Sequence, residues 1–112
     1  MDYVRFGPHV DDACKTKAGR TGATVLLYLN GDGGGGGGGG ERPLPPLAGG
    51  ETVFYRGRYG AVKGVACEWA PAAGSALVHR HGARCLLHEA RAVTAGAKYV
   101  LRTDIVYAAA PR

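Results

Sequence analysis

Short runs of β-branched, aromatic and aliphatic residues alternate with polar residues along most of the chain, and glycine or proline separates the runs. A period of two with this punctuation is typical of β-strands that bury one face. Turn-forming residues occupy 71–74 and 94–96. The pattern predicts strands at about residues 24–30, 52–55, 76–79, 85–89 and 98–107.

The longest break in this pattern is a run of eight glycines at 33–40, followed by a segment rich in proline and glycine up to Gly50. Glycine loses the most entropy on ordering and proline has no amide hydrogen to donate, so neither suits a strand or a helix. We therefore expect residues 31–50 to form a long flexible loop. No Lys-Ser or Lys-Thr pair follows the glycines, which argues against a phosphate-binding loop.

Apolar residues at helical spacing are missing from nearly the whole chain, and the segment 12–20 is the one candidate helix. Several short strands with spaced turns predict an all-β sandwich or barrel. A chain of 112 residues has the usual size of one domain. We therefore expect a single all-β domain over residues 1–112.

The net charge of +5 comes entirely from the second half of the chain, where 8 basic residues face 3 acidic ones. These basic residues are scattered singly without interleaved aromatics, so we expect no nucleic-acid partner. No apolar run approaches the roughly 18 residues of a membrane span, and the acidic N-terminal segment lacks a signal-peptide core. The sequence predicts a cytoplasmic protein without a membrane partner, whose three cysteines, Cys14, Cys67 and Cys85, are free thiols.

His9 and Asp11 lie two residues apart in an extended-looking segment, and such residues point to the same face of a strand. Two donors on one face can chelate a metal, although a His-x-Asp pair is common by chance. A third donor would come from His79, His81 or His88. His88 lies in an apolar segment, where a histidine is more often a hydrogen-bonded core residue than a ligand.

Lys98 favours the interpretation of His88 as a metal ligand, because Lys98 lies ten residues later, across the turn at 94–96. Antiparallel strands joined by that turn would bring the ammonium near the metal-facing side of His88. This geometry suits an anionic cosubstrate that chelates a metal at one end and presents a carboxylate at the other. Two imidazoles and one carboxylate with open positions form the facial triad of non-haem Fe(II) oxygenases.

The remaining polar and aromatic candidates are given structural roles. We expect His79 and His81 to be solvent-exposed at a turn, because they follow a strand and precede a glycine. Cys85 is expected to lie in the core and face away from His88. Phe54 and Trp69 are expected to pack.

At this point the sequence resembles a known family, the Fe(II)- and 2-oxoglutarate-dependent dioxygenase domain of the prolyl 4-hydroxylase type. The resemblance covers nearly the whole chain outside 31–50 and keeps the family's order. It is carried by FGPHVD at 6–11, LLYLN at 26–30, GGETVF at 49–54, GSAL at 74–77, LHE at 87–89 and GAKYVLRTD at 96–104.

The resemblance implies that His9, Asp11 and His88 bind iron and that Lys98 pairs with the distal carboxylate of 2-oxoglutarate. It also implies that Tyr28 reaches the same carboxylate. Strand periodicity places Arg102 on the face of Lys98, so Arg102 is a second anion contact or, alternatively, the partner of Asp104 in an ion pair.

The implied fold is a double-stranded β-helix, or jelly roll. The implied reaction hydroxylates an unactivated C–H bond of a peptide, such as a peptidyl proline, or of a small molecule. It consumes O2, decarboxylates 2-oxoglutarate to succinate, and uses ascorbate as reductant. The chain begins eight residues before His9, so we expect an N-terminally truncated form of the family domain. The loop at 31–50 is hypothesised to be a lid.

Two other functions remain open. One is a non-catalytic jelly-roll binding module derived from such an enzyme. The other is a cupin-like metal protein that does not use 2-oxoglutarate, which would leave Lys98 unexplained.

Overall fold

A computed structural model describes residues 6–31, 45–58 and 61–108. Within these ranges the chain is mainly β-strand, all strand pairs are antiparallel, and the one helical element is a 3-10 turn at Gly82–Arg84. The predicted all-β class is confirmed. Nothing helical in the described residues has the length and apolar character needed to cross a membrane.

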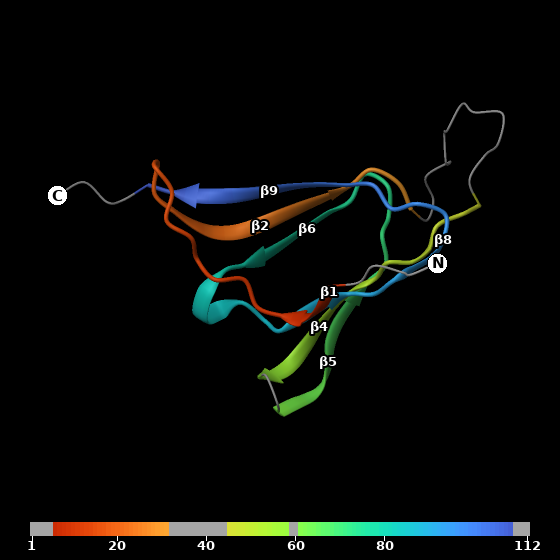
Figure 1. Ribbon diagram of the computed structural model, residues 1–112, viewed down its shortest axis with the longest axis horizontal. Helices are drawn as coiled ribbons and strands as arrows, with labels where there is room; N and C mark the ends of the chain where they lie inside the picture. The colour runs from red at the N-terminus through yellow and green to blue at the C-terminus, as the bar shows by residue number, and fades with distance from the viewer. Residues whose placement is uncertain (1–5, 32–44, 59–60, 109–112) are drawn as a thin grey trace.

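The described strands follow one another as β1 (Phe6–His9), β2 (Arg20–Tyr28), β3 (Ala48–Gly49), β4 (Thr52–Arg58), β5 (Ala61–Trp69), β6 (Ala76–Arg80), β7 (His88–Ala90), β8 (Val93–Ala95) and β9 (Val100–Tyr107). They form a four-stranded sheet in the order β1-β7-β4-β5, a three-stranded sheet in the order β6-β2-β9, and the small pair β3-β8. Figure 1 shows the two larger sheets as separate layers, with β9, β2 and β6 above β1, β4 and β5.

Residues between these layers make the small core. Tyr28 on β2 and Phe54 on β4 are 1% and 6% exposed, while Val53, which is 0% exposed, lies on the opposite face of β4 from Phe54. In the three-stranded sheet Leu26 pairs with both Leu77 and Arg102, so these three side chains share one face.

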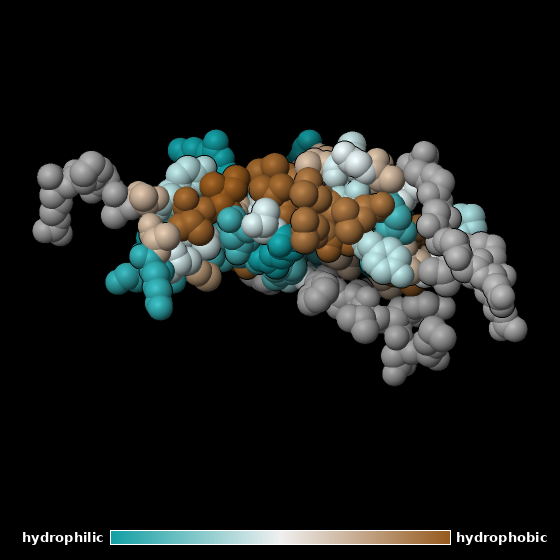
Figure 2. Space-filling view, turned by 90° about the horizontal axis from the view of Figure 1, so that it is seen from above, coloured by the Kyte–Doolittle hydropathy of each residue, from teal (hydrophilic) through white to brown (hydrophobic). Residues whose placement is uncertain are grey.

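The opposite face of the three-stranded sheet is apolar but exposed. Leu27, Val78 and Leu101 are 36%, 57% and 54% exposed. Figure 2, viewed from above this sheet, shows apolar side chains in a band along it. Because residues of the three-stranded sheet are apolar on both faces, the hydrophobic pattern predicts its strands but does not identify the buried face.

The strands expected at 24–30, 52–55, 76–79 and 98–107 are present with shifted ends. The strand expected at 85–89 begins only at His88, and residues 94–96 overlap strand β8 instead of forming only a turn. The long strand β5 was missed, because every residue of it is exposed and register shifts interrupt its pairing with β4. Trp69 at its end is 40% exposed, so its expected packing role is wrong, whereas Phe54 is buried as expected.

The helix expected at 12–20 is also wrong. Lys15 and Arg20 form an isolated antiparallel bridge, and Thr16 closes the turn between them. The Thr16 hydroxyl donates to the carbonyl of Gly19 and accepts from its amide, which replaces the hydrogen bonds a helix would provide.

Much of the expected loop at 31–50, including the glycine run and hence the lid hypothesis, lies outside the described residues. Its last part is not a loop, because Ala48–Gly49 forms β3 and pairs with β8.

Candidate metal centre

Three imidazoles surround the carboxylate of Asp11. The Nε2 atom of His9 lies 3.8 Å from Oδ1, and the Nε2 atoms of His79 and His88 lie 3.6 Å and 3.4 Å from Oδ2. These separations are longer than hydrogen bonds, which measure about 2.7–3.2 Å. They leave room for an ion between the nitrogen and oxygen atoms.

Strand pairing places two of these imidazoles side by side. In the β1–β7 pair His9 is opposite His88, and their ring centroids lie 4.4 Å apart. Asp11 follows β1 and is held by its backbone: its amide donates to Cys85 Sγ at 3.3 Å, and its carbonyl accepts from Gly82 at 2.8 Å. The predicted His9, Asp11 and His88 are therefore brought together in the structure.

Backbone carbonyls orient both rings. The Nδ1 atom of His88 lies 2.8 Å from the Leu86 carbonyl, and that of His9 lies 2.8 Å from the Gly7 carbonyl. A carbonyl oxygen only accepts, so each Nδ1 carries the hydrogen and each Nε2 keeps its lone pair. Metal-binding histidines are typically oriented in this way by a second hydrogen bond.

The donor set fits a divalent metal. Metal–nitrogen bonds of about 2.0–2.1 Å separate neighbouring ligand atoms by about 3.0 Å in an octahedron and about 3.4 Å in a tetrahedron. The observed nitrogen–oxygen separations of 3.4–3.8 Å are at or slightly above these values, with His9 facing Oδ1 of Asp11 and His79 and His88 facing Oδ2. His88 is 5% exposed and its ring lies 5.3 Å from that of Phe54, so the centre has an apolar wall.

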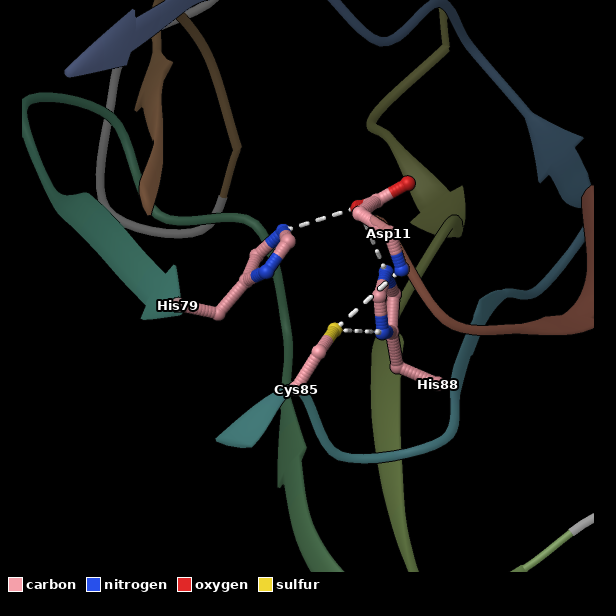
Figure 3. Close-up of side chains that lie close together, drawn as sticks. All are labelled: Asp11, His79, Cys85 and His88. Atoms are coloured by element: carbon pink, nitrogen blue, oxygen red, sulfur yellow. Dashed lines mark hydrogen bonds and ion pairs between the residues drawn. The ribbon is translucent and has the colours of Figure 1, made fainter. Parts of the chain in front are cut away.

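The expected exposure of His79 and His81 is wrong, because their side chains are only 8% and 3% exposed. Exposure alternates along β6, with Ala76, Val78 and Arg80 exposed and Leu77 and His79 turned inward. An imidazole two residues after an inward leucine faces the same side. This signal was present in the sequence and was outweighed by the glycine that follows. Figure 3 shows His79 reaching from β6 toward Asp11.

His79 is suited to remain neutral. Burial lowers its pKa, and the neighbouring His88 lowers it further. A neutral imidazole is the form that binds metals.

His81 belongs to a different cluster. Its Nε2 and Nδ1 atoms lie 2.5 Å and 2.9 Å from the hydroxyls of Thr24 and Thr21, and Asp104 accepts a hydrogen bond from Thr24. Both ring nitrogens therefore have hydrogen-bonding partners. This network joins the ends of β2, β6 and β9.

Cys85 also differs from expectation, since its Sγ lies 3.8 Å from His88 Nδ1 instead of facing away. Residues 85–87 lie between the 3-10 turn and β7 and belong to no strand, so the strand alternation used to place Cys85 does not apply to them. One donor atom each from Asp11, His79, Cys85 and His88 lie within 4.8 Å of one another (Figure 3). Burial raises the pKa of Cys85, which favours the neutral thiol over the metal-binding thiolate. All three cysteines are free.

Tyr28 and Lys98 meet between the sheets. The Tyr28 hydroxyl lies 3.1 Å from the Thr52 hydroxyl, and Lys98 Nζ lies 5.7 Å from the centre of the Tyr28 ring. Nζ donates to the Gly50 carbonyl at 2.7 Å. Burial raises the pKa of Tyr28 and lowers that of Lys98. Among the described residues Lys98 forms no ion pair, although the Glu51 carboxylate partly offsets the effect of burial on its pKa. A half-buried ammonium in this setting attracts a further anion.

Arg102 is less involved. Its side chain is 56% exposed and its Nε lies 3.7 Å from Asp104 Oδ1, which is the alternative ion pair considered from the sequence.

No protein-family model matches this chain, and no curated protein or solved structure matches it either.

Proposed function

We propose that this chain is an Fe(II)- and 2-oxoglutarate-dependent dioxygenase domain that hydroxylates an unactivated C–H bond. The observation that carries the proposal is the convergence of His9 Nε2 and His88 Nε2 on the Asp11 carboxylate, with both Nδ1 atoms committed to carbonyls. Two imidazoles and one carboxylate are the donor set of such enzymes. The resemblance of the sequence to the prolyl 4-hydroxylase type supports the same function.

In this proposal His9, Asp11 and His88 hold Fe(II), which with 2-oxoglutarate and O2 supplies the oxidation of the C–H bond. Phe54 excludes water from one side of His88. Two facing antiparallel sheets are the arrangement expected of a jelly roll, and we include that fold in the proposal.

Lys98 and Tyr28 are proposed to bind the distal carboxylate of 2-oxoglutarate. Tyr28 contacts Thr52, which lies two residues before Phe54 on β4, and Phe54 pairs with His88. Two residues of strand span about 7 Å, so the anion site lies within reach of a short dicarboxylate whose other end is at the metal. Ascorbate would serve as the reductant.

The substrate would enter beside His79. A cavity of about 250 Å³ there is lined in part by Phe54, Leu77, His79 and Leu86, with Arg84 among its polar residues. Pockets that enclose whole small-molecule ligands usually measure about 300–1,000 Å³. The space is open to solvent and would admit one side chain of a peptide, such as proline, or part of a small molecule.

The test is an anaerobic titration of the full chain with Fe(II) and then 2-oxoglutarate. We expect a weak visible charge-transfer band in the parent protein that is lost in His88→Ala. Arg80→Ala is a matched control, since the Arg80 side chain is exposed at the end of β6 next to His79, and it should leave the band intact. A folded parent protein without the band would refute the proposal.

A non-catalytic metal-binding module is the second candidate. The observation that favours it is the third imidazole, His79, beside the Asp11 carboxylate. This function predicts metal binding without any spectral change on addition of 2-oxoglutarate, and without succinate formation when O2 and peptides are supplied.

A further inference from the structure

His79 reaches the Asp11 carboxylate from the other layer of the molecule. His9 and His88 belong to the four-stranded sheet, whereas His79 lies on β6 of the three-stranded sheet. The His79 and His88 rings lie 4.5 Å apart, nearly the same as the 4.4 Å between His9 and His88. Geometrically, His79 is as close to the centre as the residues predicted from sequence.

We propose that His79 is a fourth protein ligand, so that the metal is held by three imidazoles and the Asp11 carboxylate and joins the two sheets. The proposal rests on the metal-binding part of the proposed function and does not depend on 2-oxoglutarate. Metal sites with several imidazoles are common for divalent transition metals.

The surroundings of His79 favour a ligand over a structural histidine. Its Nε2 atom lies 3.6 Å from Asp11 Oδ2, too far for a hydrogen bond but suitable for two ligands of one ion. Its Nδ1 atom lies 3.5 Å from the Arg80 carbonyl, which is also longer than an ordinary hydrogen bond, so no short hydrogen bond within the described residues occupies either ring nitrogen. His81, two residues later, shows the structural alternative, because threonine hydroxyls bond both of its nitrogens.

Cys85 is not included in the ligand set. Its Sγ lies on the Nδ1 side of His88, 3.8 Å away, whereas the His88 Nε2 atom faces the carboxylate. The Asp11 amide donates to this sulfur, so Cys85 positions the Asp11 backbone.

A fourth ligand changes the number of positions open to small molecules. In an octahedral centre three protein donors leave three positions, whereas four leave two. Two positions suffice for a chelating 2-oxo acid and leave none for O2. His79 would therefore have to leave the metal before O2 could bind. Bound His79 would thus prevent the metal from reacting with O2.

The test measures Co(II) affinity of the full chain by competition with a chromophoric chelator. We expect His79→Ala to weaken Co(II) binding by at least about 10- to 100-fold, the effect typical even of residues that only support a ligand. Imidazole in solution should restore the parent visible spectrum in His79→Ala. Arg80→Ala is the matched control, because the Arg80 side chain is exposed at the next position of β6, and it should stay within about twofold of the parent, less than 0.5 kcal/mol in binding free energy.

Each outcome decides the proposal. His79→Ala that binds Co(II) as tightly as the parent, while His88→Ala does not, overturns it and leaves the dioxygenase function standing. His79→Phe, which keeps a ring of similar size, guards against misfolding, and its metal-free circular dichroism should match the parent. Weak binding by both His79 variants with imidazole rescue supports the fourth ligand, even if 2-oxoglutarate proves not to bind. A thiolate-to-Co(II) charge-transfer band lost in Cys85→Ala would overturn the assigned ligand set.

Discussion

Replacing Tyr28 by phenylalanine removes a single hydroxyl that joins the two sheets. That hydroxyl lies on β2 and meets the Thr52 hydroxyl on β4 at 3.1 Å. Tyr28 is 1% exposed and Thr52 is 4% exposed, so water cannot replace the lost partner without entering the core. The ring itself remains in place, and the change isolates the hydrogen bond.

The expected loss follows from this burial. Leaving a buried hydroxyl without a partner costs about 1–3 kcal/mol, whereas removing both partners is nearly neutral. For a chain of about this length, each 1 kcal/mol lowers the melting temperature by roughly 4 °C. We therefore expect Tyr28→Phe to melt about 4–12 °C lower, and Tyr28→Phe/Thr52→Val to recover most of this loss.

Urea unfolding followed by circular dichroism measures all four proteins of this double-mutant cycle. The reasoning is refuted if the double variant loses the sum of the two single losses, because the hydroxyls would then act independently. Measuring the 2-oxoglutarate affinity of the same proteins distinguishes an effect on stability from an effect on binding. Thr52→Val leaves the Tyr28 hydroxyl free for a carboxylate, so it should keep 2-oxoglutarate affinity, whereas Tyr28→Phe should lower it.

Two further predictions concern ligands. The affinity for 2-oxoglutarate, measured calorimetrically, should fall as pH rises through the Lys98 pKa, which burial holds below the ordinary lysine value of 10.5, because only the ammonium attracts a carboxylate. Lys98→Met should bind weakly at every pH, and a parent affinity that stays constant well above that range would contradict the assignment. Co(II) at about 100 times its dissociation constant should raise the free energy of unfolding by about 2.7 kcal/mol, and a chelator should remove the gain. The gain should be absent in His88→Ala, and an equal gain there would place the metal elsewhere.

Local pattern predicted the strands that are rich in β-branched, aliphatic and aromatic residues. The run around Val53 and Phe54 on β4 was recognised because β-branched and aromatic residues occupy Thr52 to Tyr55 without interruption. Strand β5 failed the same test, since Gly64 and the exposed Val62 and Val65 give it no buried face. Its pairing with β4 determines it, and pairing is a long-range property that periodicity does not report.

The candidate site divides in the same way. His9 and Asp11 could be linked by strand spacing. The expected antiparallel pair that joins His88 to Lys98 is wrong, because β7 pairs with β1 and β4, whereas β9, which follows Lys98, belongs to the other large sheet and pairs with β2. His79 could not be ranked from its neighbours, because the glycine after His81 suggested exposure while the period shared with Leu77 indicated burial. The fold decides between the two, because the four-stranded sheet covers this face of β6 and encloses the ring.

The segment between His88 and Lys98 connects the proposed metal site to the proposed anion site. Between them β8 pairs with β3, and Gly96 turns the chain with a φ of +71°, where a Cβ atom would lie 2.6 Å from the Pro45 carbonyl. Only glycine tolerates both the conformation and the contact. The turn directs Lys98 back to the Gly50 carbonyl, two residues before Thr52 on the strand that pairs with His88. Strand register therefore sets the distance between the His88 ring and the Lys98 ammonium, so moving this turn by one residue should disturb the proposed anion site while leaving the three imidazoles in place.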